Sequence, residues 1–391
     1  MNNSNNKYKI LLVGDYSGVH YEIAEELKKR NYKVDLLSSG DGYKGFKSNL
    51  YLKEINPFLM NIPFAGKIYK GILDYSGLKG IILFLFNIRL INNLKNYDVV
   101  QIINPIALEE FGSIANYLFL KKLIKNNKNF YLCAMGSDYT FVRYCLDDKL
   151  EYSALKSYKF SELGGLTFNY LRDKAHALRY VYGFFYSQLN SYALKNAKKI
   201  IPGASDFSLA YSENNKITEI IPLPVNLKNF SAPSKTKYPV KIFLGIQVGK
   251  EYIKGHPFFI EAINMLINNY PNEKFNLQVA RSLAFPDYVN VFKDCDIFLD
   301  QCLGHGIGVN AALGLAAGKV VFSGTNPKFC DLDKEVTINA HPDVKLIYEQ
   351  LLNLIDDLSF IDFIKEASYD YAIRNNSVDK VVDKYINIWF E

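Results

Sequence analysis

The stretch DIFLDQCLGHGIGVNAALGLAAGKVVFS, residues 296–323, decides the fold. It contains an apolar run at Asp296–Asp300, a glycine-rich turn, a segment of small apolar residues at 309–317 and a second apolar run at Lys319–Ser323. Short, continuously apolar runs are typical of strands that are buried on both faces, and a helix between two of them makes the strands parallel. The stretch therefore predicts a strand, a helix and a second strand of an α/β domain.

The residues before this stretch repeat the alternation of strands and helices. The apolar run Tyr8–Gly14 predicts a first strand, and Val19–Lys29 follows with apolar residues at helical spacing. Two segments without a clean period, 39–75 and 134–175, predict long loops, which in α/β domains serve binding or act as lids. Further strands are expected at 32–38, 98–103, 130–134 and 199–202, and further helices near 83–95, 108–125 and 176–197.

A proline-rich stretch, residues 223–240, divides the chain, and the alternation restarts after it. We therefore expect an α/β protein with two Rossmann-like, doubly wound parallel-sheet domains, at 1–232 and 238–370. A helical tail, 371–391, is expected to pack back toward the first domain. In the second domain, strands are expected at 241–246, 275–280, 296–300 and 319–323, and helices at 257–268, 288–293, 309–317 and over most of 342–390.

The composition excludes several classes of protein. The 391 residues are 49% hydrophobic and 22% charged, which excludes a disordered chain, a collagen and a coiled coil. Five scattered cysteines without a C-x-x-C pair exclude a disulfide framework and a zinc site, and they favour the reducing cytosol. No signal peptide is recognisable, and the longest aliphatic and aromatic run, 81–86, is far shorter than the roughly 20 residues that span a bilayer. We expect a globular, cytoplasmic protein.

The charge is divided unequally along the chain. Residues 1–235 carry 31 basic and 20 acidic side chains, whereas residues 236–391 carry 15 and 20. This asymmetry indicates an anionic partner for the front half, either a membrane surface or a nucleic acid; the alternative is an ordinary solvated surface. Basic and aromatic residues interleave at Phe84–Lys95 and Arg179–Tyr186, as in a helix that lies on an anionic membrane, although a core between helices is favoured for the latter segment. No nucleic-acid motif is present, so no nucleic-acid partner is expected.

The glycine-rich turn is a candidate phosphate-binding loop. Gly304, Gly306 and Gly308 lead into a helix whose first N–H groups suit an anion; the alternative is a tight turn that needs glycines. The turn is no dinucleotide fingerprint, because it lies in the second domain and lacks an acidic residue about 20 positions on. Three neighbouring residues are further candidates for binding the ligand: Asp300, Gln301 and, unless it caps the helix, Asn310.

Two lysines follow the first strand of the second domain. Lys250 and Lys254 can neutralise a diphosphate as point charges beside a helix N-terminus. The alternative is that they are surface lysines on a loop. No metal ion and no cofactor is expected, because these cations and the helix N-terminus supply the charge.

The first domain has candidate residues after two of its strands. Gly14, Ser17, Gly18 and His20 follow the first strand, at the edge where open α/β sheets bind ligands, and His20 is alternatively a structural histidine. Ser137 and Asp138 follow the strand at 130–134 and are expected at the same edge. The Asp138 carboxylate can take a proton from a hydroxyl group or steady a cationic transition state, or else it only forms its own turn.

Four segments together resemble the GT-B glycosyltransferases of family four: residues 9–38, 245–263, 297–324 and 368–389. The resemblance implies that Lys254 binds the diphosphate of a nucleotide-sugar donor and that Asp300 and Gln301 hold hydroxyl groups of the sugar. It also implies that the candidates of the first domain lie on the acceptor side: Gly14, Ser17, Gly18, His20, Ser137 and Asp138. Members of this family carry two Glu residues in an E-x7-E pattern, and here Leu313 and His305 occupy those positions. His305 can still donate a hydrogen bond to a sugar hydroxyl or, when protonated, stabilise the departing diphosphate.

The resemblance implies a glycosyltransferase that transfers a sugar, with retention of configuration, from a nucleotide-sugar donor to a saccharide or lipid-linked acceptor. The implied setting is polysaccharide or glycan assembly at the cytoplasmic face of a membrane, with the protein bound peripherally. Two alternatives remain open. They are a sugar-nucleotide epimerase of the same two-domain build and a catalytically inactive sugar-nucleotide-binding protein.

Overall fold

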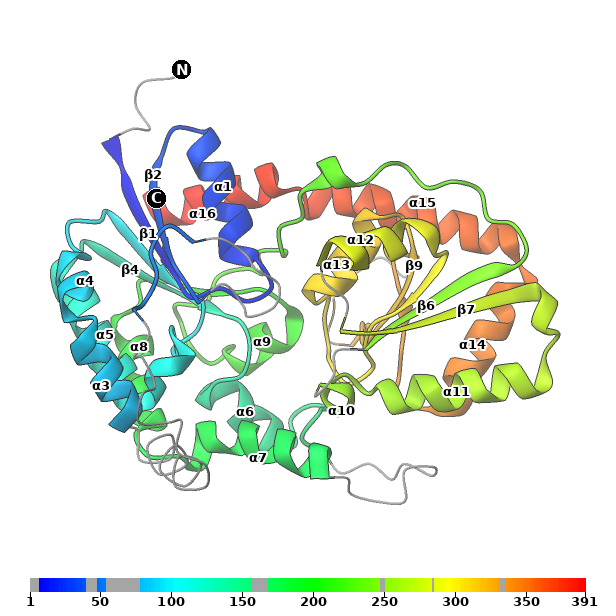
Figure 1. Ribbon diagram of the computed structural model, residues 1–391, viewed down its shortest axis with the longest axis horizontal. Coiled ribbons are helices and arrows are strands. Elements are labelled where there is room, and N and C mark those ends of the chain that lie inside the picture. Colours follow the sequence, from blue (N-terminus) through cyan, green and yellow to red (C-terminus); the bar gives the residue numbers. More distant parts are fainter. Residues whose placement is uncertain are drawn as a thin grey trace.

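Two five-stranded parallel sheets, each covered by helices, form two domains that lie side by side in the computed structural model (Figure 1). Every strand pair in both sheets is parallel, which explains why inner strands such as those at 9–13 and 297–299 are apolar on both faces. The structure describes residues 7–39, 48–53, 78–156, 168–246, 250–282, 285–328, 330 and 335–391.

The two sheets have the same strand order. In the first sheet it is β2-β1-β3-β4-β5, and in the second it is β10-β9-β8-β6-β7, which is the same arrangement read from the other edge. In each sheet the second strand of the domain pairs on one side of the first strand, β1 or β6, and the third strand pairs on its other side. The connections therefore diverge at the first strand, which leaves a crevice beside its carboxyl end. The strands are β1 (Lys9–Val13), β2 (Lys33–Leu37), β3 (Val99–Ile102), β4 (Asn129–Ala134), β5 (Ile200–Pro202), β6 (Val240–Ile246), β7 (Phe275–Arg281), β8 (Ile297–Leu299), β9 (Val320–Ser323) and β10 (Ile338–Asn339).

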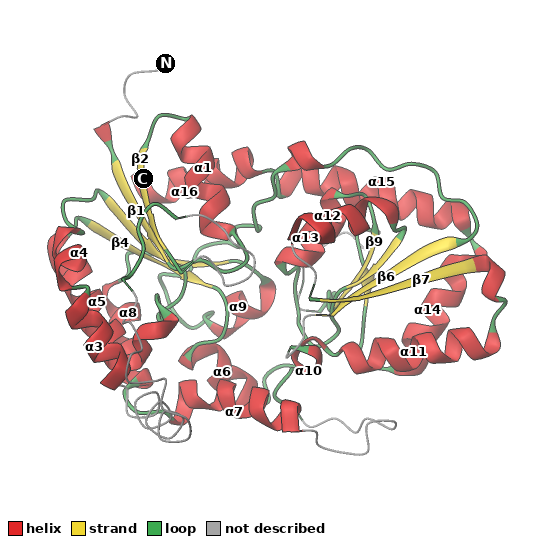
Figure 2. Cartoon of the chain, in the orientation of Figure 1, coloured by secondary structure: helices red, strands yellow, loops and turns green. Residues whose placement is uncertain are grey.

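Helices cover the sheets largely as the apolar periodicity predicts, and three of the expected segments differ (Figure 2). The segment expected as one helix at 83–95 is two helices, because the Asn87 side chain bonds to Leu83 O and to the backbone of Lys53. The segment at 176–197 is also two helices, interrupted at Gly183–Phe185. The expected loop at 134–175 contains α6 and the start of α7, while most of the expected loop at 39–75 lies outside the described residues.

The longer helices of the first domain are α1 (Val19–Lys29), α3 (Leu78–Phe86), α4 (Ile88–Asn93), α5 (Gly112–Asn126), α6 (Tyr139–Leu146), α7 (Phe168–Tyr182), α8 (Tyr186–Asn196) and α9 (Ser205–Ala210). Those that follow are α10 (Glu251–Lys254), α11 (His256–Asn269), α12 (Phe285–Asp294), α13 (Val309–Ala316), α14 (Val344–Asp356), α15 (Leu358–Asn375) and α16 (Val378–Phe390). Across the described part of the chain, no helix has the length and apolar character needed to cross a membrane.

The last helix, α16, packs on the first domain beside α1 (Figure 1). The Trp389 indole N–H donates to Gln101 Oε1 at 2.9 Å, and the Tyr131 hydroxyl donates to Trp389 O at 3.0 Å. Arg30, which caps the end of α1, forms an ion pair with Asp383 of α16. The apolar face of α16 is therefore part of the core beneath β1 and β4.

The chain crosses between the domains twice, and the two crossings run side by side. Val225 N donates to Asn376 O at 2.7 Å, and Val378 N donates to Val225 O at 3.2 Å. The Asn376 side chain adds a bond to Leu223 O at 2.9 Å. Because these bonds tie the crossings together, a movement of one domain relative to the other bends both at the same place.

Candidate functional site

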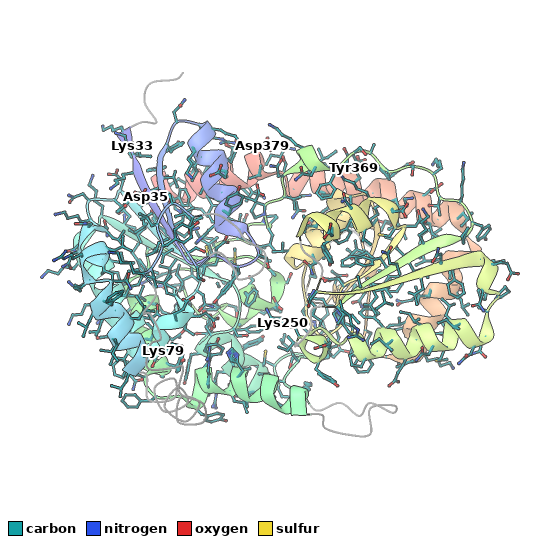
Figure 3. All side chains as sticks on the ribbon, viewed as in Figure 1. Lys33, Asp35, Lys79, Lys250, Tyr369 and Asp379 are labelled. Atoms are coloured by element: carbon teal, nitrogen blue, oxygen red, sulfur yellow. The ribbon has the colours of Figure 1, made fainter. Side chains whose placement is uncertain are left out.

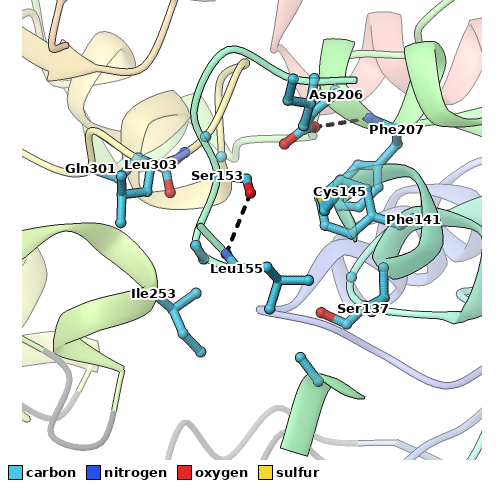
Figure 4. A pocket seen from close by; sticks show the side chains of 18 of the residues that line it. Ser137, Phe141, Cys145, Ser153, Leu155, Asp206, Phe207, Ile253, Gln301 and Leu303 are labelled. Carbon is cyan, nitrogen blue, oxygen red and sulfur yellow. Dashed lines mark hydrogen bonds between the residues drawn. The ribbon is translucent and has the colours of Figure 1, made fainter. Parts of the chain in front are cut away.

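A cavity of about 300 Å³ lies between the domains (Figure 4). Its wall includes backbone or side chains of five of the residues singled out above, namely Ser137, Gln301, Gly304, Gly306 and Gly308. They come from the segments that follow β4 and β8, so carboxyl-terminal strand ends from both sheets contribute to one cavity. Ligands of open α/β sheets bind at this edge, which makes the cavity the candidate site.

The glycine-rich turn, residues 303–308, brings the second domain against the first. A Cβ atom at Gly306 would lie 3.0 Å from Ser205 N at the start of α9, so any side chain there would push the two segments apart by a few tenths of an ångström. Gly308 caps α13, whose first N–H groups have no acceptor within the helix. The turn therefore closes one side of the cavity and aims the N-terminus of α13 at the same edge of the sheet.

Lys254 and Asp300 form a buried ion pair beside the cavity. Lys254 Nζ lies 2.6 Å from Asp300 Oδ1, and the two side chains are 18% and 1% exposed. Their neighbours Ile253 and Gln301 line the cavity. Asp300 Oδ2 is buried and has no hydrogen-bond partner among the described residues. The Lys254 ammonium group therefore lies at the crevice beside β6, where the Asp300 carboxylate is its counter-ion.

The other three donor-side candidates differ in position. Gln301 lines the cavity, where its side-chain amide donates to Gly306 O at 3.4 Å. Lys250 is exposed and stands immediately before α10 (Figure 3). Asn310 is the second residue of α13, half-buried and outside the wall of the cavity. Gly308, and not Asn310, occupies the cap position that the sequence had offered to Asn310.

The loop after β1 is shaped by close backbone packing. Gly14 has φ +73°, and a Cβ atom there would lie 2.4 Å from Ala107 O. Ser17 and Gly18 also have positive φ angles, and Gly18 caps α1. None of these three residues lines the cavity. The loop instead reaches its edge through Tyr16, whose ring packs over Gly136.

His20 is structural, and the expectation that it acts on the acceptor does not fit its surroundings. Its side chain is fully buried, with Nδ1 bonded to Gly14 O at 2.7 Å and Nε2 3.1 Å from the Gln101 side-chain amide. Burial lowers the pKa of His20 to about 4, so the ring is neutral near pH 7. Through its bond to Gly14 O, the buried His20 ring holds the loop after β1 in place.

Asp138 is also structural. Its carboxylate caps α6 by accepting a bond from Phe141 N at 2.8 Å, and its other oxygen accepts a bond from the Tyr211 hydroxyl. The side chain is fully buried and does not line the cavity. Burial raises the pKa of Asp138 to about 6. The expectation that this carboxylate meets an acceptor hydroxyl is therefore not supported, and the turn-forming alternative describes its contacts.

His305 joins the two domains. Its Nε2 lies 2.7 Å from Tyr152 O, and the imidazole stacks on the Tyr152 ring with the centroids 4.1 Å apart. Glu151 adds a bond from the Asn326 side chain at 3.0 Å. His305 is fully buried, and burial lowers its pKa. Its ring thus holds the segment 150–156 of the first domain against the second, which is a different role from the sugar contact expected.

Asp206 is the carboxylate that the sequence reasoning missed. It lies in the first turn of α9, lines the cavity, and accepts bonds from Phe207 N, at 2.9 Å, and from the backbone N–H of His305 (Figure 4). Burial raises its pKa to about 6. Its position directly after β5 was the available signal, because it is the same kind of position that singled out Asp138.

Comparison with solved structures agrees with the two repeated sheets. A glycosyltransferase from Rickettsia africae ESF-5 is 16% identical, with 98% of each chain covered and a TM-score of 0.54. Alr3699/HepE of Anabaena, solved with UDP and glucose, is 9% identical over 97% of this chain and 99% of that chain, with a TM-score of 0.53. The chain has the GT-B fold.

The GT-B fold is shared by enzymes with different reactions. A 2.2 Å structure described as a putative UDP-N-acetylglucosamine 2-epimerase from Listeria monocytogenes is 9% identical over 97% of this chain and 95% of that chain, with a TM-score of 0.51. No protein-family model and no curated protein matches the chain. At these identities the likeness establishes the fold, so the activity has to be argued from the site.

Proposed function

We propose that the protein is a glycosyltransferase that binds a nucleotide-sugar donor at the second domain and an acceptor at the first. The observation that carries the proposal is a cavity to which the strand ends of both sheets contribute, with the glycine-rich turn and Asp206 in its wall. Two substrates bound from opposite domains meet in such a cavity, which gives the proximity that group transfer requires. The structural neighbours include a glycosyltransferase and a protein solved with UDP and glucose, which supports this choice.

The donor diphosphate is proposed to bind between Lys254 and the N-terminus of α13. Lys254 is the half-buried cation at the crevice beside β6, and the helix N-terminus adds N–H donors and a favourable dipole. Lys250 stands close by at the start of α10 and is exposed to solvent. These groups stabilise the charge that develops on the departing diphosphate, so the proposal needs neither a metal ion nor a cofactor.

Asp206 is proposed to orient the acceptor hydroxyl and to accept its proton. Its carboxylate lines the cavity, and a pKa of about 6 leaves it ionised at pH 7 but basic enough to share a proton in the transition state. Two backbone N–H groups fix its orientation, from Phe207 and His305. Because His305 belongs to the second domain, this orientation exists only when the domains are together.

The test is to incubate the protein with a panel of nucleotide sugars and to measure both the release of nucleotide and the fate of the sugar. Release that depends on an added hydroxyl acceptor supports transfer. An altered sugar that is still attached to its nucleotide favours the second candidate, an epimerase, which the likeness to the Listeria structure makes specific. Binding of a nucleotide sugar without any reaction identifies the inactive binding protein. The absence of binding to any member of the panel refutes the proposal.

A peripheral position on an anionic membrane, at its cytoplasmic face, is part of the proposal. Helix α3 points four apolar side chains outward, at i, i+4, i+7 and i+8, and its inner face is buried in the core. Residues 78–97 contain three basic residues and no acidic residue. An exposed apolar stripe with only basic charges around it is complementary to an anionic lipid surface. The stripe consists of Leu78, Ile82, Leu85 and Phe86.

A further inference from the structure

The cavity between the domains combines polar groups with an apolar wall. The polar residues of its lining are Ser137, Ser153, Lys174, Asp206 and Gln301, together with the backbone of the glycine-rich turn. Figure 4 shows Gln301 and Leu303 across the cavity from Phe141 and Cys145. The first domain contributes an apolar wall that is made by Phe141, Val142, Cys145, Leu150, Leu155 and Ala177.

The apolar wall is held in place by contacts outside the cavity. Val142, Cys145 and Leu150 are buried, and the Phe141 ring packs on the Phe207 ring with the centroids 4.7 Å apart. The segment that carries Leu150 and Leu155 is anchored to the second domain by the stacking of Tyr152 on His305. A wall fixed in this way can bind a ligand without first being ordered, which favours affinity.

We propose that the acceptor is amphiphilic: its hydroxyl group lies at Asp206 and an apolar segment attached to it fills the pocket lined by the apolar wall. This inference rests on the proposed function and names the class of acceptor. A saccharide alone would place hydroxyl groups against six side chains that offer no hydrogen-bond partner of comparable strength, and buried polar groups without partners weaken binding. A volume of about 300 Å³ admits a short apolar segment and not a whole lipid, so longer chains must leave the cavity.

The experiment uses n-alkyl glucosides from methyl to octyl, below the concentrations at which they form micelles. Their affinity for the full chain with saturating UDP is measured by calorimetry. Each methylene group that enters the pocket should tighten binding about fourfold, until the pocket is full and further methylene groups add little. Equal affinity for methyl and octyl glucoside, with UDP still bound, overturns the inference and leaves the proposed function standing. Failure of the wild-type protein to bind UDP or any other nucleotide counts against the proposed function itself.

A pair of alanines on α7 supplies a matched control. Ala177 lines the pocket, whereas Ala175, two residues earlier on the same helix, is exposed. Ala177→Leu should reduce the affinity for octyl glucoside at least tenfold and leave that for methyl glucoside unchanged, because the larger side chain occupies the space for the alkyl group. Ala175→Leu should bind both glucosides as the wild type does. Equal binding of octyl glucoside by the two variants also overturns the inference, and circular dichroism verifies that both are folded.

Discussion

Removing Lys254 should weaken nucleotide binding and destabilise the second domain at the same time. The Lys254 side chain is 18% exposed, and its partner Asp300 is 1% exposed, so Lys254→Ala leaves a buried carboxylate without a counter-ion. Breaking such a pair costs about 3–5 kcal/mol of stability, which lowers the Tm by roughly 10 °C for a domain of this size. Loss of the charge-assisted contact to a diphosphate should weaken binding by about 1.5–3 kcal/mol.

The two effects are separated by the double variant Lys254→Met, Asp300→Leu. It replaces the ion pair by apolar side chains, so its Tm should return close to that of the wild type while UDP binding stays weak. Differential scanning calorimetry measures the first quantity and titration calorimetry the second. Full-strength binding of UDP by the double variant would remove Lys254 from the donor site. A Tm for Lys254→Ala equal to that of the wild type would refute the assignment of a buried ion pair.

The remaining predictions concern the catalytic carboxylate, a structural carboxylate, the last helix and the membrane surface. Asp206→Asn should reduce turnover about 10²-fold with donor binding intact, and wild-type turnover should rise with pH through about 6, as the carboxylate loses its proton; a flat pH profile would count against a base. Asp138→Asn should keep turnover within a few-fold of the wild type, since an amide oxygen can still cap α6. Burial raises the pKa of Asp138 in the folded state to about 6, so the folded state holds the carboxyl proton more tightly than the unfolded state does. The contribution of Asp138 to stability therefore falls as the pH rises from about 4 to 6. If Asp138→Asn loses activity while its Tm is unchanged, Asp138 belongs to the site after all. Trp389→Ala should destabilise the first domain by about 3–5 kcal/mol in chemical unfolding, and an unchanged midpoint would contradict its place in that core. Phe86→Glu should abolish co-sedimentation with anionic vesicles, whereas Phe363→Glu, at a similarly exposed position in the second domain, should not; equal binding by both variants would contradict the proposed surface.

The fold could be predicted from the sequence because continuous apolar runs and helical periodicity reflect burial directly. The runs at 8–14 and 296–300 coincide with β1 and β8 to within one or two residues, and Val19–Lys29 is α1. The breaks at Asn87 and Gly183 could not be predicted, because they depend on bonds to distant backbone and on one residue, Phe185, with a positive φ angle. The periodicity of apolar residues shows which face of a helix or strand is buried, but it does not show where such hydrogen bonds interrupt a helix.

The candidate site was predicted less well than the fold. Position after a strand led to Ser137, Gln301, Gly304, Gly306 and Gly308, which line the cavity; their part in binding stays a prediction. The same rule cannot tell whether a side chain points into the cavity or is hydrogen-bonded to a nearby backbone N–H group. It therefore selected Asp138, whose carboxylate accepts a bond from Phe141 N. Contacts between the domains, such as that of His305 with Tyr152, join residues 153 positions apart and leave no local signal in the sequence.

The return of α16 to the first domain determines the order in which the protein can be completed during synthesis. Val381, Val382 and Tyr385 belong to the same apolar cluster as Ile10 and Leu12 of β1. A nascent chain that has just finished β5 therefore exposes the surface that α16 later covers, and the whole second domain must be made before that surface is closed. At the slow end of the usual translation rates, about 5 residues per second, the time between the synthesis of β5 and that of α16 is tens of seconds. During it the growing chain presents an apolar face to chaperones, while the second domain, made entirely of residues that lie between the two crossings, can fold before the first is finished.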